Sequence, residues 1–350
     1  MKIFDKINKN YHLKLPFVAY RKPNKNKVLG KFLKTDDIIF TSSFTESGFV
    51  FAPFDDQKNT ILFLDKEAES FEEDFIEKVN TSENFYFTEN NTSKEKHIAL
   101  VKRAIKQIEN SDLKKIVVSR KEQLQLNEFD IITIYQKLLD KYKTAFVYVW
   151  YHPKIGLWFG ATPETLLEIK DNTFKTMSLA GTQPYANKEN IVWGNKEIEE
   201  QQLVTDFIEN QIKDIAKNIS IEKAKTVKAG TLLHLKSKVN GELCKSSSFI
   251  SLIKALHPTP AVCGLPREKA KAFILQNENY TRSFYTGFLG EINKVDDQNS
   301  SHLFVNLRCM EVTNNIASIY VGGGITKDSN PLKEWQETIS KTATMKNVLQ

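Results

Sequence analysis

The chain has 350 residues, of which 41% are hydrophobic and 26% charged, and its formal net charge is +6. This length supports a sizeable core in one large domain or two ordinary ones, and the composition excludes a disordered or fibrous protein. No stretch approaches the roughly 18 uninterrupted apolar residues of a membrane span, and the polar N-terminus lacks a signal-peptide core. Three cysteines without CxxC spacing favour a reducing compartment, so we expect a cytoplasmic protein with no membrane partner.

The positive charge comes mostly from lysines distributed along the whole chain. A nucleic-acid-binding protein more often concentrates such charge in a stripe or arm, so we expect no nucleic-acid partner. The lysine-rich segments at residues 24–27 and 213–228 are interpreted as solvated faces. A positive balance would also steer an anionic small molecule.

The first half of the sequence predicts mostly strands. The first ninety residues have the pattern of short strands and turns, and apolar positions at helical spacing then predict a helix over residues 93–110. The expected strands cover residues 37–42, 48–53, 60–64, 115–120, 145–151 and 156–159, with a hairpin over 166–170 and 173–179.

The second half alternates longer helices with strands. An apolar stripe predicts a helix over residues 195–217, and Pro331 suits the first position of a C-terminal helix. The other expected elements are helices over 249–256 and 267–276 and strands over 232–240, 283–293, 303–313 and 315–321. Because strands outnumber helices and often form hairpins, we predict an α+β fold with large antiparallel sheets, as a single domain over residues 1–350.

Two pairs of glutamates stand near the starts of predicted helices. Glu334 and Glu337 follow the glycine run at residues 322–324, and Glu197 and Glu200 follow Asn195. Residues three apart share a helix face, so each pair could provide oxygen ligands to Mg²⁺. Acids in a first turn also compensate the helix dipole, which leaves a purely structural interpretation open.

Other chemical signals are weak when each is taken alone. The glycine run lacks the Gly-Lys-Ser/Thr sequence of a phosphate loop, and neither glutamate pair has the histidine spacing of a di-iron site. His234, in an alternating strand, is by itself more typical of a core histidine. Lys115 could be a charged strand edge, and Glu164 could simply end a turn.

Taken together, the segments resemble the Mg²⁺-dependent chorismate-utilising enzymes: isochorismate synthase, anthranilate synthase component I, aminodeoxychorismate synthase and salicylate synthase. The resemblance covers about residue 95 to the C-terminus and is looser over residues 1–94. It rests on nine motifs in the family's order, at residues 115–120 (KIVVSR), 160–167 (GATPETLL), 179–182 (LAGT), 197–204, 232–235 (LLHL), 257–266 (HPTPAVCGLP), 282–287 (RSFYTG), 305–309 (VNLRC) and 322–338.

The resemblance implies both a fold and a chemistry. The implied fold is one α/β domain with two antiparallel sheets stacked face to face, helices outside and the site in a cleft. In the isochorismate synthase reaction, water attacks C2 of chorismate as hydroxide leaves C4, so a base and an acid are needed. Lys115 matches the family's base, and Glu164 matches its acid.

The resemblance also implies binding roles. Glu200 and Glu337 match the ligands of Mg²⁺, and Glu197 and Glu334 would be auxiliary ligands. The positions implied to contact chorismate are Gly181, Thr182, His234, Ala261, Tyr285, Arg308, Gly322 and Lys341. Two departures from the family are Glu-Glu-Gln at residues 199–201, where His-Glu-His is frequent, and Glu197 in place of aspartate.

A few positions distinguish the family members. Lys115 favours water as nucleophile, since the ammonia-using anthranilate synthases lack this lysine, so we expect no obligatory glutamine amidotransferase subunit. Ala180 replaces the nucleophilic lysine of aminodeoxychorismate synthases, and Ala261 replaces a threonine of the ammonia enzymes and salicylate synthases. We therefore expect an isomerase that makes isochorismate for menaquinone or siderophore synthesis. The alternatives are a salicylate synthase, another chorismate-utilising enzyme and a catalytically silent chorismate-binding protein.

Overall fold

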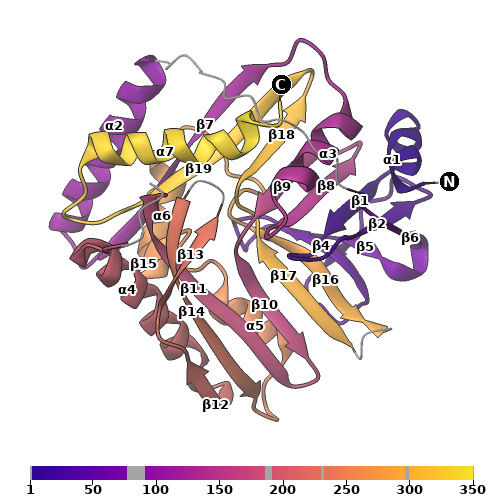
Figure 1. Cartoon of the computed structure of the whole chain (residues 1–350). Coiled ribbons are helices and arrows are strands. Elements are labelled where there is room, and N and C mark those ends of the chain that lie inside the picture. The colour runs from indigo at the N-terminus through magenta and orange to yellow at the C-terminus, as the bar shows by residue number, and fades with distance from the viewer. Residues whose placement is uncertain (1, 77–90, 186–190, 230–231, 296–298, 350) are drawn as a thin grey trace.

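The computed structural model describes residues 2–76, 91–185, 191–229, 232–295 and 299–349. In these residues the chain forms two antiparallel sheets, here called sheet A and sheet B (Figure 1). Sheet A consists, in spatial order, of β15 (Gly264–Leu265), β7 (Lys115–Gln125), β19 (Ile316–Ile325), β18 (Cys309–Thr313), β9 (Gly156–Thr162), β8 (Phe146–His152), β1 (Phe17–Arg21), β2 (Lys27–Leu33) and β6 (Ala68–Asp74).

Sheet B contains a continuous row of strands. The short strand β13 (Lys225–Ala229) lies outside this row and pairs with β14, as β12 also does. In spatial order, the strands of the row are β12 (Ala216–Ile221), β14 (Leu232–Leu243), β11 (Thr173–Pro184), β10 (Thr165–Lys170), β17 (Ser300–Val305), β16 (Phe288–Lys294), β4 (Gly48–Ala52), β5 (Thr60–Leu64) and β3 (Phe40–Thr41). A 3-10 turn, η1 (Asp65–Glu67), follows β5.

A layer of aromatic side chains joins the two sheets. Phe146 of β8 stacks on Phe304 of β17 with ring centroids 4.1 Å apart. Phe63 of β5 stacks on Trp150 of β8 at 5.2 Å. Such rings bury large apolar areas, which explains why this two-sheet protein contains 23 phenylalanines.

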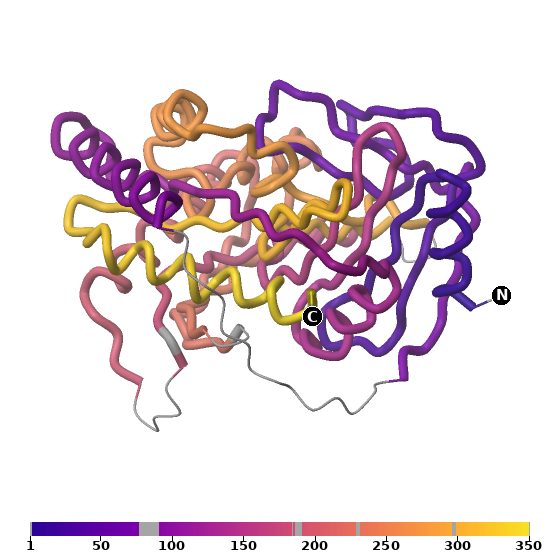
Figure 2. Tube along the Cα trace, turned by 90° about the horizontal axis from the view of Figure 1, so that it is seen from above, coloured from indigo at the N-terminus to yellow at the C-terminus, as the bar shows by residue number. Residues whose placement is uncertain are grey.

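Helices cover the outer faces of the sheets. The helices α1 (Ile3–His12) and α3 (Ile131–Lys141) share an apolar cluster with sheet A, and α4 (Asn195–Ile212) and α5 (Phe249–Leu256) share one with sheet B. The helices α2 (Asn91–Glu109), α6 (Arg267–Asn277) and α7 (Pro331–Lys346) contact β7, β19 or both. Figures 1 and 2 show α1 and α2 at opposite ends of the molecule.

The pairing of β7 with β19 brings two of the predicted motifs together. Their register runs from Ile116 opposite Ile325 to Gln125 opposite Ile316, so the glycine run of β19 lies beside the start of β7. Because α7 follows β19 directly, its acidic first turns return to the same end of the sheet. The order of strands therefore places Lys115 near the two glutamates of α7.

The predicted α+β class with two antiparallel sheets and outer helices is confirmed, but the expectation of only strands and turns before residue 90 is wrong for Ile3–His12. These residues form α1, whose Ile3 and Ile7 are buried one turn apart. The helix α3 was not predicted either. Its N-cap Asp130 accepts a hydrogen bond of 2.6 Å from the amide of Thr133.

Several predicted boundaries also differ, and three of the differences have a clear local cause or consequence. The helix predicted over 195–217 ends at Ile212, and residues 216–221 form the edge strand β12 instead. The strand predicted from residue 283 begins only at Phe288, because Ser283 and Thr286 have φ angles of 53° and 61°. The strand predicted over 303–313 divides into β17 and β18 before Arg308, whose φ is 48°.

The N-terminal strands belong to both sheets. The strands β1, β2 and β6 extend sheet A, and β3, β4 and β5 extend sheet B. The remainder of the predicted N-terminal segment, residues 77–90, lies outside the described residues. Among the helices that the structure describes, none has the length and apolar content to cross a bilayer.

Candidate active site

One cavity gathers most of the predicted site residues from distant parts of the chain. Its walls come from β7, β11, β14, β19, α4, α7 and the segments that precede β10, β15, β16 and β18. The predicted residues that line it are Glu164, Gly181, Thr182, Glu200, His234, Ala261, Tyr285, Arg308, Gly322, Glu337 and Lys341.

Lys115 reaches this cavity through an ion pair. It is the first residue of β7, its side chain is buried, and its Nζ donates a 2.7 Å hydrogen bond to Oε1 of Glu200 on α4. A Cβ on Gly324 would lie 2.6 Å from Cε of Lys115 and 2.7 Å from Oε1 of Glu200. Only glycine at this position of β19 leaves room for the pair.

Glu164 is a buried acid in the short segment between β9 and β10, and only 3% of it is exposed. Burial raises the pKa of its carboxyl to about 8, and the nearby positive charge of Lys115 lowers it only in part. Glu164 is therefore mostly protonated at neutral pH. A protonated carboxyl in a cavity can donate a proton to a leaving oxygen.

The acids of α7 are each paired with a lysine. Glu337 forms an ion pair of 2.6 Å with Lys341. Burial alone would raise the pKa of Glu337, but the charges of Lys341 and Lys196 outweigh it and lower that pKa. Glu334 pairs at 2.8 Å with Lys196 of α4, and burial together with the charge of Glu337 raises its pKa. Glu337 therefore faces the cavity as a carboxylate, while Glu334 links α7 to α4.

The helix α7 begins as predicted. Asn330 is its N-cap and accepts hydrogen bonds from the amides of Leu332 and Lys333, and Pro331 occupies the first helical position.

Glu197 lies near the cavity but does not line it. It stands in the first turn of α4, and its Oε2 lies 2.7 Å from the point where a Cβ on the N-cap Gly194 would be. The side chain thus turns back toward its own helix start, and its auxiliary role in metal binding stays a prediction.

Gln201, which stands where the family often has a histidine, has a structural role. Gln201 is buried in α4, donates a 2.7 Å hydrogen bond to Oγ of Ser178 and accepts one of 3.0 Å from the amide of Ala180. These bonds fix α4 to β11 one residue before Gly181. They hold the neighbouring Glu200 toward the cavity.

Positive side chains gather at another part of the wall. Lys341 donates a 2.9 Å hydrogen bond to the carbonyl of Gly322, and Nη1 of Arg308 donates one of 3.3 Å to the carbonyl of Lys341. Tyr285 is buried beside them, and its ring stacks on Tyr320 with centroids 5.6 Å apart. A guanidinium, an ammonium and a phenol together suit a carboxylate ligand.

His234 presents a neutral imidazole to the cavity. Burial, and then the charges of Arg308 and Lys341, lower its pKa to about 3. Its Nδ1 lies 3.0 Å from the carbonyl of Gly181, so it carries the proton and donates it there. The buried Nε2 has no partner in the described part of the chain and can accept a hydrogen bond from a ligand hydroxyl.

The sequence interpretation missed several wall residues. These residues include Leu179, Thr286, Leu307 and Tyr320. Each lies in or close to one of the motifs, and this nearness in sequence to predicted site residues was the one signal that could have identified them.

The donor set allows a magnesium site but does not form a complete one. Among the described residues, no three His, Cys, Asp or Glu side chains converge closely enough to hold a metal ion. Mg²⁺ usually needs only one or two carboxylates and completes its shell with water and substrate oxygens. Glu200 and Glu337, which approach one cavity from two helices, fit that requirement.

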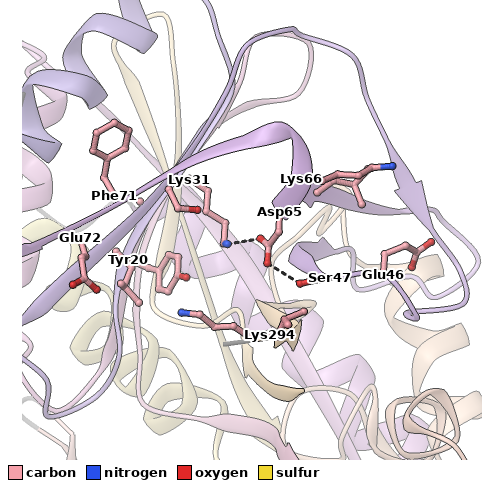
Figure 3. A pocket seen from close by; sticks show the side chains of 14 residues that line it. Tyr20, Lys31, Glu46, Ser47, Asp65, Lys66, Phe71, Glu72 and Lys294 are labelled. Atoms are coloured by element: carbon pink, nitrogen blue, oxygen red, sulfur yellow. Dashed lines mark hydrogen bonds and ion pairs between the residues drawn. The ribbon is translucent and has the colours of Figure 1, made fainter. Parts of the chain in front are cut away.

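A second cavity lies between the last two strands of sheet A, β2 and β6, and the end of β5 in sheet B (Figure 3). Lys31 forms an ion pair with Asp65, which also accepts a 2.7 Å hydrogen bond from Ser47. The described residues that line this cavity include none of the predicted site residues.

The comparisons with known proteins decide the family. The model described as "Chorismate binding enzyme" matches residues 42–350, which is most of the chain. The chain belongs to the chorismate-binding enzyme family. This assignment confirms the resemblance on which the site residues were chosen.

Individual relatives are similar over shorter stretches. Isochorismate synthase DhbC of Bacillus subtilis is 33% identical over 196 residues, covering 53% of this chain and 48% of that protein. Isochorismate synthase MenF of Haemophilus influenzae is 26% identical over 254 residues, covering 69% and 58%. Anthranilate synthase component 1 of Thermococcus kodakarensis is 25% identical, covering 71% and 58%. The matched part of the chain thus spans about half the length of these curated relatives.

Solved structures show the same fold. The structure of DhbC from Bacillus anthracis superposes with a TM-score of 0.82 at 24% identity and covers 99% of both chains. MenF from Escherichia coli gives a TM-score of 0.78 at 19% identity, over 96% of this chain and 89% of that one.

Proposed function

We propose that this chorismate-binding enzyme is an isochorismate synthase, an isomerase that converts chorismate reversibly to isochorismate. The observation that carries the proposal is that Lys115, Glu164 and Glu200, which come from distant parts of the sequence, lie together at one cavity. Lys115 is the residue that distinguishes water-using members of the family, and Glu164 is buried and mostly protonated near neutral pH. Isochorismate synthases among the similar proteins support the same reaction.

The proposed mechanism uses one base and one acid. To act as the base, Lys115 must first lose the proton of the ammonium that pairs with Glu200; its amine then accepts a proton from a water molecule whose oxygen forms a bond to C2 of chorismate. The ring double bonds shift, the C4–O bond breaks, and Glu164 donates a proton to the departing hydroxide, which leaves as water. One water enters and one leaves, so the product is an isomer of the substrate. Proton transfers of this kind contribute about 10²- to 10⁴-fold each.

The remaining wall residues would bind the substrate. Arg308 and Tyr285 would hold the enolpyruvyl carboxylate, with Lys341 adding positive charge beside Gly322. His234 would accept a hydrogen bond from a ring hydroxyl through Nε2. Gly181, Thr182 and Ala261 would shape the wall around the ring.

We further propose that Glu200 and Glu337 hold Mg²⁺ beside the ring carboxylate, with Glu197 and Glu334 as auxiliary acids. When bound, the ion would neutralise that carboxylate and orient the ring. The family's common use of Mg²⁺ and the position of the two glutamates on one cavity support this cofactor.

Product analysis tests the proposal. The purified protein is incubated with chorismate and Mg²⁺, without glutamine or ammonia, and the products are separated. We expect isochorismate, with no pyruvate, salicylate or anthranilate, and no turnover after EDTA treatment. Release of pyruvate with salicylate would instead establish a salicylate synthase. Binding of chorismate without any product would establish a silent chorismate-binding protein.

A further inference from the structure

The strands β11 and β14 present one face to solvent beside the candidate active site. Along β14, Leu235, Ser237 and Val239 are buried, while the alternate residues Lys236 and Lys238 are half-buried and exposed. Successive side chains of a strand point to opposite faces, so both lysines stand on the face that does not pack against α4.

Three lysines crowd together on this face. Lys225 of β13 is the direct cross-strand partner of Lys236, and Lys238 follows two residues later. Glu222 forms ion pairs with Lys225 at 3.4 Å and with Lys238 at 3.9 Å. The side chain of Lys236 makes no ion pair or hydrogen bond within the part of the chain that the structure describes. Burial and the charge of Lys238 lower its pKa, as expected among like charges.

These three residues, here called the lysine face, adjoin the cavity directly. Lys236 lies two residues beyond His234 on the same side of β14, and it is paired across the sheet with Leu179 of β11. Both His234 and Leu179 line the cavity. Positive charge therefore extends from the solvent-facing strands to Arg308 and Lys341 inside the site.

We propose that the lysine face attracts the dianionic dicarboxylate substrate to the cavity and speeds its binding. The proposal rests on the proposed function, because chorismate carries two carboxylates. Among the described residues, Glu222 is the one carboxylate that forms ion pairs with these three lysines, so a positive charge remains. A field of one sign at a cleft raises the local concentration of an oppositely charged ligand. Lys225 belongs to the segment 213–228, so this part of the segment is more than a solvated face.

The test compares rates at two ionic strengths. The triple variant Lys225→Gln, Lys236→Gln, Lys238→Gln is measured at about 20 mM and about 300 mM salt, because the Debye length falls from over 20 Å to under 6 Å. The readouts are kcat, kcat/KM and the association rate constant of chorismate, followed by stopped-flow tryptophan fluorescence. At low salt we expect kcat/KM and the association rate constant of the triple variant to fall about three- to tenfold. The fall should come from a higher KM, with kcat unchanged. At high salt the variant and the wild type converge.

A matched control removes the same number of charges far from the site. Lys9, Lys14 and Lys25 are exposed in the N-terminal part of the chain, and their replacement by glutamine should leave the salt dependence unchanged. An equal loss at both ionic strengths, no loss, or the same loss in the control overturns the proposal. If wild-type protein binds chorismate without turnover, the proposed function fails, but the association rates still decide the role of the lysine face. Absence of chorismate binding overturns both.

Discussion

Lys115 and Glu164 are both buried, but within the described part of the chain only Lys115 has a charged partner in direct contact. The ammonium of Lys115 has a carboxylate partner, Glu200, at 2.7 Å. Burial dominates at Glu164 and keeps its carboxyl mostly protonated near pH 7. If Glu200 held Mg²⁺ in the proposed reaction, it would no longer pair with Lys115, and the ammonium could lose its proton more easily. The proposed base and the proposed metal ligands would thus be coupled through Glu200.

Replacement of Lys115 by alanine tests the base. We expect kcat to fall on the order of 10²- to 10⁴-fold, because no other group would take the proton from water. The adjacent Lys114 is exposed and supplies the matched control, Lys114→Ala, which should retain nearly full activity. A loss below tenfold for Lys115→Ala would move the base to another residue.

The pH dependence of the rate tests the acid. Glu164 must be protonated to donate, and its pKa is about 8, so kcat/KM should fall as the pH rises through about 8. Because the pKa of Glu164 is raised from 4.5 to about 8 in the folded protein, its protonation stabilises the fold fully below about pH 4.5, and this contribution is lost as the pH rises from there through about 8. The variant Glu164→Gln should be about 10²- to 10⁴-fold slower and lack this alkaline decline. An unchanged decline in the variant would assign it to a different group.

At the scale of elements, the site depends on how two helices meet one glycine-containing strand. The helices α4 and α7 provide Glu200 and Glu337, and the ion pair of Lys196 with Glu334 joins their first turns. The strand β19 passes so close to Lys115 and Glu200 that it has no space for a side chain at Gly324.

Two alanine substitutions in β19 test this close approach. Gly324→Ala would place a Cβ 2.6 Å from Cε of Lys115, so the ion pair must shift, and we expect kcat to fall roughly 10²-fold. Gly323→Ala places its Cβ 3.3 Å from a carboxylate oxygen of Glu334, which can move, so its loss should be at least several-fold smaller. Equal kinetic effects of the two variants would contradict the geometry.

The sequence predicted these elements unevenly. The helix α7 was found from Pro331 and its acids, since capping signals are local. The end of α4 was missed because residues 213–217 have no local stop signal, and β12 forms by pairing with the distant β14. The role of Gly324 could not be predicted, because it depends on side chains from β7 and α4 that only the folded chain brings together.

At the scale of the whole molecule, the aromatic layer between the sheets holds the two halves of the site. Both sheets contain strands from the N-terminal third and from the C-terminal half. The α+β class followed from strand patterns and the family resemblance. The pairing of Lys115 with Glu200, 85 residues apart, could be expected only from the family's motifs, because nothing in local pattern specifies it.

Truncation of one ring tests the importance of this layer. Phe51 is fully buried and stacks on Phe284 at 4.2 Å, so Phe51→Ala should lower the free energy of unfolding by about 3–5 kcal/mol. Phe40, which is 49% exposed, provides the control, and Phe40→Ala should change it by less than about 0.5 kcal/mol. Urea titration at constant pH measures both. Similar small changes for the two variants would show that the layer is not critical.

The central claim is that water attacks C2 while the C4 hydroxyl leaves, and one labelling measurement tests it most directly. Chorismate is incubated with the enzyme and Mg²⁺ in H₂¹⁸O for less than one turnover of the reverse reaction, and the isochorismate is analysed by mass spectrometry. The proposed mechanism predicts one ¹⁸O atom in each isochorismate molecule, located at the C2 hydroxyl. Unlabelled isochorismate would show that the original hydroxyl migrates, and a product other than isochorismate would contradict the proposed function itself.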